Sequence, residues 1–260
     1  MHDGHMALVR RARELSSDGT PVVVSIFVNP TQFGPREDFS RYPRTLEADL
    51  ERCRSAGVDV VFAPPAEVVY PSDITVMAPP LPLVATEPGL EDRIRPGHFA
   101  GVCQVVSRLF DLLRPRWAVF GEKDYQQLRV IEAMTGNGAW GVRIAPVATV
   151  REPDGLAMSS RNRYLDTARR TRATALFAAL ARANEHDRPD AAEEVMRRTL
   201  AEWGLAVEYA VVRDAETLMP LTSEGVPSRR ARSLLAARLG EIRLIDNAPW
   251  VGSRTPAGLD

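Results

Sequence analysis

The chain has 260 residues, 45% of them hydrophobic and 26% charged, with a formal net charge of −1. This is an ordinary globular composition, and it lacks the overall basic character that would favour a nucleic-acid partner. No apolar run reaches the roughly 18 residues of a membrane span, and no signal peptide is visible. Cys53 and Cys103 lie outside any C-x-x-C motif. We therefore expect buried free thiols, a cytoplasmic location and no membrane partner.

Strands and helices alternate through the first 150 residues. The spacing of apolar residues predicts helices at 5–15, 46–53, 99–113 and 128–134. Apolar runs predict buried strands at 21–28, 58–63, 117–120 and 142–147. Residues 64–97 form a proline-rich excursion, and long loops of this kind tend to be functional. The alternation predicts a doubly wound, parallel α/β sheet.

The character of the sequence changes near residue 150, where residues 151–155 are rich in turn formers. Helices are predicted at 166–185 and 190–203, and short strands at 207–213 and 242–246. We expect a first domain over residues 1–149 and a smaller α+β domain over residues 150–260. The basic runs at 169–172 and 229–232 are interpreted as solvated helix faces.

The most informative motif follows the predicted strand at 117–120. Residues 121–127 read Gly-Glu-Lys-Asp-Tyr-Gln-Gln. Gly121 allows a ligand to approach the backbone, the ammonium of Lys123 suits a phosphate, and glutamine amides both donate and accept hydrogen bonds. Open α/β sheets bind ligands at the carboxyl ends of their strands, so this segment is predicted to form part of a binding site.

Two histidines open the predicted first helix, in the sequence His2-Asp3-Gly4-His5. A helix N-terminus attracts anions, and imidazoles can stabilise charge that develops on a phosphoryl group. A phosphate site is therefore one interpretation. Chance histidines in an N-terminal tail are another. A metal site is a third, although zinc takes three or four ligands and the other histidines are distant in sequence.

Asn29 and Gln32 follow the predicted strand at 21–28. Asparagine before proline commonly starts a turn, so Asn29 fits either turn chemistry or a binding site. Gln32 has less structural reason to stand there and is the better binding candidate. Arg95, at the end of the excursion, is a candidate anion ligand. His98 fits either a site or packing at the start of the next helix.

A polar cluster, Met158-Ser159-Ser160-Arg161-Asn162, follows the joint near residue 150. Two hydroxyls, consecutive backbone N–H groups and an arginine make a suitable clamp for an oxyanion. The alternative is an N-cap for the following helix, a position that serine also favours. Asp166 stands closer to that helix, and this favours the clamp.

Together these segments resemble the pantothenate synthetase (pantoate–β-alanine ligase) family. The resemblance covers most of the chain in the family's order, and it rests on the segments 2–5, 25–33, 42–45, 98–102, 121–127 and 158–164. The strings at 121–127 and 158–162 are highly specific. His-x-Gly-His is shared with the wider nucleotidyltransferases and class I aminoacyl-tRNA synthetases. The implied fold is a Rossmann-like sheet of that nucleotidyltransferase type with a smaller α+β lid domain.

The resemblance implies an AMP-forming ligase that makes pantothenate in two steps. The carboxylate of pantoate attacks the α-phosphorus of ATP, which gives pantoyl adenylate and pyrophosphate. The amine of β-alanine then attacks this mixed anhydride and releases AMP. Such chemistry needs alignment and charge neutralisation more than covalent help. Magnesium carried on the phosphates, with no protein metal ligand, and a homodimer through the first domain are also implied.

The resemblance also implies a residue set for each role. The catalytic set, which stabilises charge on the phosphates, is His2, His5, Lys123 and Arg161. The ATP-binding set is His2, His5, Gly121, Lys123, Asp124, Val150, Met158, Ser159, Ser160 and Arg161. In this set Gly121 and Asp124 hold the ribose, and Met158 lies beside the adenine. The pantoate-binding set is Gln32, Gln127, Asn29 and Arg95.

One departure from the family lies ahead of the His-x-Gly-His string. The family has a first strand and a Pro-Thr-Met-Gly-Ala-Leu turn there, and this chain has only Met1. That strand is expected in the middle of the sheet, so without it both neighbours would carry unpaired backbone. A late assigned start is the favoured explanation. The alternatives are an inactive or weakly nucleotide-binding remnant, or an adenylyltransferase with another acid substrate.

Overall fold

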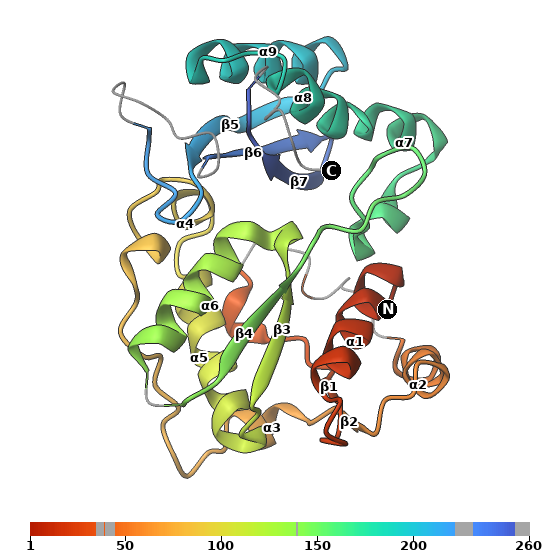
Figure 1. Cartoon of the computed structure of the whole chain (residues 1–260), viewed down its shortest axis with the longest axis vertical. Coiled ribbons are helices and arrows are strands. Elements are labelled where there is room, and N and C mark those ends of the chain that lie inside the picture. Colours follow the sequence, from red (N-terminus) through yellow and green to blue (C-terminus); the bar gives the residue numbers. More distant parts are fainter. Residues whose placement is uncertain (35–38, 40–44, 139, 222–230, 253–260) are drawn as a thin grey trace. The chain divides into compact units, whose positions relative to one another are not determined.

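The computed structural model of the chain describes residues 1–260 except 35–38, 40–44, 139, 222–230 and 253–260 (Figure 1). The chain divides into two compact units, Met1–Ala148 and Thr149–Asp260. Most of the segment 42–45, together with Arg229 and Arg230, lies outside the described residues. No described helix is long and apolar enough to span a bilayer.

The first unit is α/β, and its strands pair in parallel, which confirms the predicted class. Strand β1 (Val23–Ser25) pairs with β2 (Val60–Phe62), and β3 (Trp117–Gly121) pairs with β4 (Arg143–Val147). Among the described residues the two pairs are separate sheets, without ladder hydrogen bonds between them. The described strands of this unit thus form two parallel pairs, β1–β2 and β3–β4.

The first predicted strand is much shorter than expected. The apolar run at 21–28 contributes only Val23–Ser25 to β1. Val23 is 39% exposed and Val60, its partner across the ladder, is 49% exposed, so the prediction of a strand buried on both faces is wrong. The chain turns at Asn29–Pro30, and Phe27 packs its ring 6.3 Å from that of Tyr70 instead of extending the strand.

Helices surround the strand pair β3–β4. Helix α1 (Asp3–Leu15) packs against β3 and β4, and α6 (Tyr125–Asn137) packs against the same strands and α5 (His98–Leu113) (Figure 1). Helix α2 (Leu46–Ser55) ends before Gly57, whose φ of 70° is the left-handed conformation that glycine commonly adopts after a helix. The excursion and the strand ends contain the short helices α3 (Ala66–Val69), η2 (Leu83–Ala85), α4 (Glu91–Ile94), η1 (Pro30–Gln32) and η3 (Glu122–Asp124).

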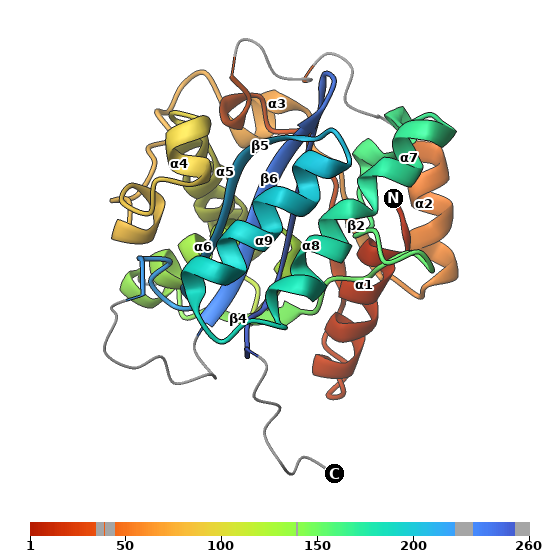
Figure 2. The ribbon, with the colours of Figure 1, turned by 90° about the horizontal axis from the view of Figure 1, so that it is seen from above.

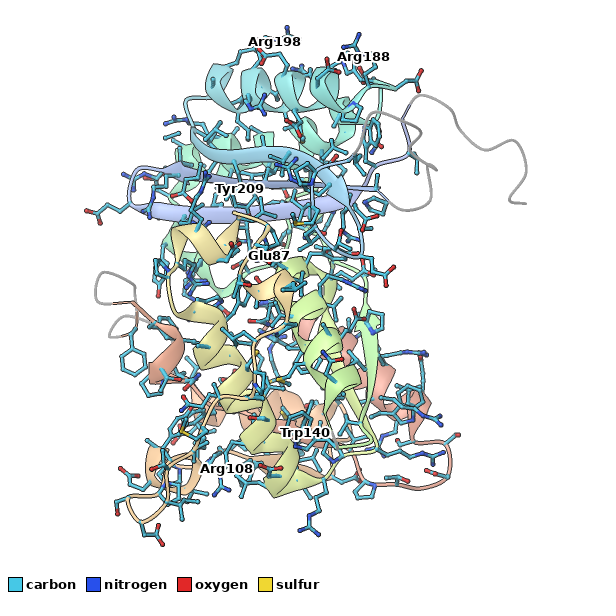
Figure 3. The ribbon with its side chains drawn as sticks, turned by 90° about the vertical axis from the view of Figure 1, so that its left-hand side faces the viewer. Glu87, Arg108, Trp140, Arg188, Arg198 and Tyr209 are labelled. Atoms are coloured by element: carbon cyan, nitrogen blue, oxygen red, sulfur yellow. The ribbon has the colours of Figure 1, made fainter. Side chains whose placement is uncertain are left out.

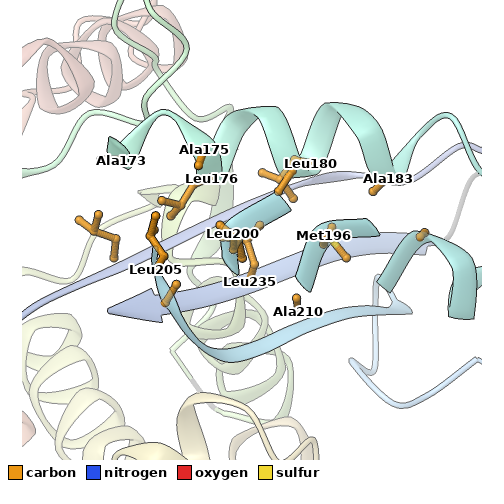
Figure 4. Packing of buried hydrophobic residues seen from close by; sticks show 14 of the residues in the cluster. Ala173, Ala175, Leu176, Leu180, Ala183, Met196, Leu200, Leu205, Ala210 and Leu235 are labelled. Atoms are coloured by element: carbon orange, nitrogen blue, oxygen red, sulfur yellow. The ribbon is translucent and has the colours of Figure 1, made fainter. Parts of the chain in front are cut away.

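The second unit is an antiparallel sheet covered on one face by helices. Its strands run in the order β5 (Ala206–Asp214), β6 (Ala231–Leu239) and β7 (Ile242–Pro249). Helices α8 (Ala175–Ala183) and α9 (Pro189–Glu202) lie side by side on this sheet (Figure 2). Between them and the sheet lies the core, which includes Leu176, Leu180, Met196, Leu200 and Leu235 (Figure 4). Arg188 and Arg198 point away from that core (Figure 3).

Strand β6 corrects the interpretation of the second basic run. Residues 229–232 were expected on a solvated helix face, yet Ala231 and Arg232 begin the central strand of the sheet. The side chain of Arg232 is buried, and its Nε donates to Asn247 Oδ1 at 2.7 Å. The first run, at 169–172, does lie on a largely exposed helix, α7 (Thr167–Ala173).

Candidate active site

The two histidines of the His-x-Gly-His string lie at the start of α1, His2 as its N-cap and His5 in its first turn. His2 precedes the helix in an extended conformation, and its backbone N–H donates to His5 Nδ1 at 3.1 Å. The two ring centroids are 3.9 Å apart. Because His5 Nδ1 accepts this bond, the proton of a neutral His5 ring lies on Nε2. Nδ1 of His2 is buried and has no partner among the described residues.

Lys123 and Asp124 reach the same region from the end of β3. Their Nζ and Oδ1 atoms are 3.5 Å apart, and the Lys123 side chain is only 22% exposed. Gly121 lies beside α1, since a Cβ added there would be 3.9 Å from Leu8 Cδ2. The charge of Lys123 helps to lower the pKa of His2, and that of Asp124 opposes the lowering of the pKa of His5. The end of β3 and the start of α1 therefore share one electrostatic environment.

Both imidazoles are neutral near pH 7 in this environment. Burial, then the neighbouring His5 ring, the Met1 ammonium and Lys123 lower the pKa of His2 to about 4. Burial also lowers the pKa of His5, with a further contribution from the Met1 ammonium. Neutral rings remain able to donate a hydrogen bond to a phosphate oxygen, while Lys123 supplies a positive charge. Lys123 is the only lysine among the 33 lysine and arginine residues of the chain.

Asn29 is buried and caps the turn η1, whose own residues are exposed or half-buried. Its Oδ1 accepts from the backbone N–H of Thr31 at 3.3 Å, from Thr31 Oγ1 at 3.0 Å and from the Tyr70 hydroxyl at 2.8 Å. Its Nδ2 donates to the Gly101 carbonyl at 3.0 Å and to Gln32 Oε1 at 3.4 Å. The Asn29 side chain is thus saturated by protein contacts, and it fixes η1 against α5.

Gln32, Arg95 and His98 form a second connected group. His98 Nδ1 lies 2.9 Å from the Gln32 carbonyl oxygen, and His98 Nε2 lies 3.0 Å from Arg95 Nη1. Arg95 also reaches the Gln32 carbonyl with Nη2 at 3.5 Å and lies 3.9 Å from the Glu91 carboxylate. His98 is buried, so the packing interpretation holds for it. The Arg95 guanidinium is directed to protein groups.

The two adjacent glutamines of the 121–127 motif differ in their surroundings. Gln126 is 3% exposed, and it accepts from the Glu91 N–H at 2.9 Å and donates to the Val84 carbonyl at 3.0 Å and to Asp92 Oδ1 at 2.9 Å. It therefore anchors the proline-rich excursion to α6. Gln127 is half-buried and has no hydrogen-bond partner among the described residues, so its amide is available to a ligand.

The polar cluster of the second unit begins at a short hairpin. Met158 N–H donates to the Val150 carbonyl at 2.9 Å, which brings these two predicted ATP-binding residues together. The Ser159 hydroxyl accepts from the Arg161 N–H at 3.3 Å and caps η4 (Ser160–Tyr164). Asp166 caps α7 through a 2.8 Å bond from the Arg169 N–H, as predicted. Ser159 therefore caps the short η4 and not the helix predicted at 166–185, and the clamp function stays a prediction.

Sequence reasoning missed several residues that shape these groups. Gln126 and Tyr70 gave no separate signal, because one stands beside an equally polar glutamine and the other lies in the proline-rich excursion. Gly101 is required for the contact of α5 with η1, since a Cβ there would lie 2.5 Å from the Thr31 carbonyl oxygen. Arg151 was noted only as part of a turn. Among the described residues, no group of three or more His, Cys, Asp or Glu side chains is arranged to hold a metal ion.

Comparison with known proteins gives a consistent match along the chain. The family model described as pantoate-beta-alanine ligase matches residues 1–249. A pantothenate synthetase of Nocardioides is 50% identical over 268 residues, which cover 99% of this chain and 78% of the relative. A pantothenate synthetase of Rubrobacter xylanophilus is 49% identical over 261 residues, covering 95% of this chain and 87% of the relative.

Solved structures agree with the sequence comparison. The pantothenate synthetase of Thermus thermophilus superposes with a TM-score of 0.88 at 43% identity, covering 96% of this chain and 89% of the other. The pantoate-beta-alanine ligase of Francisella tularensis, solved in complex with beta-gamma ATP and beta-alanine, gives a TM-score of 0.75 at 31% identity. That match covers 96% of this chain and 85% of the other.

Proposed function

The chain belongs to the pantoate-beta-alanine ligase family, and on this premise we propose which of its residues carry out the reaction. It is an ATP-dependent ligase that joins pantoate to β-alanine to give pantothenate. The observation that carries the assignment of residues is the cluster at the start of α1 and the end of β3. There, two neutral imidazoles lie in one electrostatic environment with the chain's only lysine.

The proposed reaction has two balanced steps. A carboxylate oxygen of pantoate forms a bond to the α-phosphorus of ATP, the bond from that phosphorus to the bridging oxygen breaks, and pyrophosphate leaves. The β-alanine nitrogen then forms a bond to the acyl carbon, the acyl–oxygen bond to AMP breaks, and the nitrogen loses a proton. Neither step needs a covalent enzyme intermediate, so alignment and charge neutralisation supply the catalysis.

Phosphate binding is assigned to His2, His5 and Lys123. Neutral imidazoles contribute N–H donors, and Lys123 neutralises charge that builds on the leaving pyrophosphate. The positive end of the α1 dipole, at the same turn, favours the anion as well. The lowered pKa values of both histidines support the role of hydrogen-bond donors over that of cations.

Recognition of pantoate is assigned to the amides of Gln32 and Gln127. The free amide of Gln127 suits the hydroxyl and carboxylate groups of this acid. Asn29 contributes indirectly, since its side chain is consumed in holding η1. Arg95 was expected to contact pantoate directly, and its contacts with His98 and the Gln32 carbonyl support an indirect contribution for this residue as well.

The remaining assignments concern ATP and the assembled enzyme. Asp124 and Gly121 bind the ribose, Met158 and Val150 lie beside the adenine, and the phosphates are bound by the segment Ser159, Ser160 and Arg161. Magnesium enters on the phosphates of ATP, as this ion usually does. We further propose a homodimer and a cytoplasmic location, which suits the two buried free thiols. The comparisons give no support to a non-catalytic remnant.

The test is pantoate-dependent exchange between ATP and labelled pyrophosphate, which isolates the first step. Lys123→Ala should abolish exchange, and Lys123→Arg should restore little of it, because the larger planar guanidinium does not reproduce a compact point charge. A panel of other hydroxy acids serves as the control for substrate assignment. Full exchange in the alanine variant would refute the role of Lys123, and equal exchange with an unrelated acid would refute pantoate as the substrate.

A further inference from the structure

His98 links Gln32, which is assigned to pantoate, with Arg95, whose contribution is indirect. It is the first residue of α5, and its side chain is buried between the backbone of η1 and the guanidinium of Arg95. Its Nδ1 lies 2.9 Å from the carbonyl oxygen of Gln32, and its Nε2 lies 3.0 Å from Arg95 Nη1. Both ring nitrogens are therefore engaged by protein groups.

The chemistry of these partners fixes the protonation of the ring. A carbonyl oxygen only accepts, so Nδ1 carries the proton and donates to Gln32. A guanidinium only donates, so Nε2 presents its lone pair to Arg95. His98 is thus held as the neutral Nδ1–H tautomer. A second proton on Nε2 would remove the acceptor and set one cation against another.

Arg95, the partner of His98, follows the short helix α4, and α4 is held by Gln126 of α6. Gln126 bonds the Glu91 N–H and the Asp92 carboxylate, and so fixes the short helix α4, which ends next to Arg95. Arg95 then contacts His98, and His98 contacts Gln32. A chain of contacts between buried and half-buried groups thereby links Gln126, the neighbour of Gln127, to Gln32.

We propose that His98 is a positioning residue that sets the direction of the Gln32 side chain by holding its backbone carbonyl. The proposal rests on the proposed function, in which Gln32 binds pantoate. A residue of this kind does not touch the substrate. Its loss should weaken binding of the acid while leaving ATP binding and the reacting phosphate unchanged.

Two substitutions at His98 separate its contact with the Gln32 carbonyl from its contact with Arg95. His98→Asn places an amide N–H where Nδ1 stands and keeps the donor to Gln32, whereas His98→Gln keeps an acceptor for Arg95 and loses that donor. We expect His98→Gln to raise the KM for pantoate about three- to tenfold, the range for one neutral hydrogen bond, with the KM for ATP unchanged. His98→Asn should restore a KM near that of the parent enzyme. His186→Gln, the same exchange at the only histidine of the second unit, is the matched control.

The variant Gln32→Ala distinguishes failure of this inference from failure of the proposed function. If Gln32→Ala leaves the KM for pantoate unchanged, Gln32 does not bind the acid and the proposed function of that residue is wrong. If Gln32→Ala raises it and His98→Gln does not, the role of His98 is wrong. Adding His98→Gln to Gln32→Ala should have no further effect. An equal rise of both KM values would mark His98 as merely structural and would also overturn the inference.

A measurement on the unaltered enzyme does not depend on the folding of any variant. With ¹⁵N-labelled histidine, NMR should show His98 with a protonated Nδ1 and an unprotonated Nε2, both with and without pantoate. The His98→Asn spectrum assigns its signals among those of the four histidines. A proton found on Nε2 alone would leave no donor for the Gln32 carbonyl and would overturn the proposal.

Discussion

The guanidinium of Arg151 forms a two-pronged ion pair with the carboxylate of Asp246, with Nη1–Oδ2 and Nη2–Oδ1 distances of 2.7 and 3.0 Å. The Asp246 side chain is 1% exposed. The same guanidinium donates to the carbonyls of Gly155 and Asn247 at 3.0 and 3.2 Å. The hairpin that brings Val150 and Met158 together is thus tied to β7 through one buried charge.

Arg151→Met should destabilise the protein by about 3–5 kcal/mol, because it leaves the Asp246 carboxylate buried without its partner. Urea unfolding followed by circular dichroism measures the change. The double variant Arg151→Met/Asp246→Leu should recover most of the loss, since both charges leave together. If the double variant is as unstable as the single one, the unpaired charge is not the cause.

Gly101→Ala should destabilise the first unit by about 1–3 kcal/mol, the usual cost of overpacking. The added methyl group would lie 2.5 Å from the Thr31 carbonyl oxygen and 2.7 Å from the Gln32 nitrogen, so α5 and η1 would have to separate. Gly136→Ala, at an exposed position of α6 with no atom near the new Cβ, is the matched control. It should stabilise the protein by about 0.5–1 kcal/mol. Thermal unfolding should show a lower melting temperature for Gly101→Ala and a higher one for Gly136→Ala.

Because Lys123 is the only lysine, an amine-acylating reagent has a single side chain to modify besides the chain's terminal amine. Saturating MgATP should slow the acylation of Lys123 at least about tenfold, because an occupied phosphate site excludes the reagent. Mass spectrometry of peptides gives the modification rate at each amine. A parallel labelling reaction with magnesium and without ATP gives the unprotected rate. A labelling rate of Lys123 that MgATP leaves unchanged would argue against a phosphate site at this residue.

The stability of the protein should fall as the pH drops from about 6.5 towards 4. The pKa of His2 is lowered from 6.5 to about 4 in the folded chain, so the unfolded chain binds more protons throughout this window. The free energy of unfolding therefore rises with pH there and is lost on acidification. The pKa of His5 is lowered too and acts in the same direction. Unfolding midpoints between pH 4 and 8 should show a smaller slope for His2→Gln/His5→Gln, and an unchanged slope would contradict this account.

Local patterns predicted the elements of the first unit well, because each has its own signal. Helix α5 ends at Leu113, as predicted, just before Arg114 and Pro115, and α2 ends before Gly57. The prediction of a buried strand over 21–28 was wrong, because an apolar β-branched sequence gives the same pattern whether it continues a strand or leaves it after three residues. Only the pairing with β2 decides where β1 ends.

Strand β6 shows what a single sequence does not contain. Residues 231–239 are mostly alanine, leucine and arginine, which favour helices, yet the segment becomes the central strand because it pairs with β5 on one side and β7 on the other. Tertiary contacts are equally absent from the sequence of the site. The sequence indicated Lys123, His2 and His5, but it does not distinguish the adjacent residues Gln126 and Gln127. A helix turns about 100° per residue, so it directs one of these side chains inward and the other outward.

The buried bonds of Gln126 and the open amide of Gln127 have a consequence for genetics. Alleles at position 126 would loosen residues 64–97 from α6 and yield a temperature-sensitive enzyme whose defect added pantoate does not correct. Alleles at position 127 would leave a heat-stable enzyme that is starved of its acid, so that feeding pantoate would rescue growth. Two neighbouring codons for the same amino acid would then produce two unrelated phenotypes.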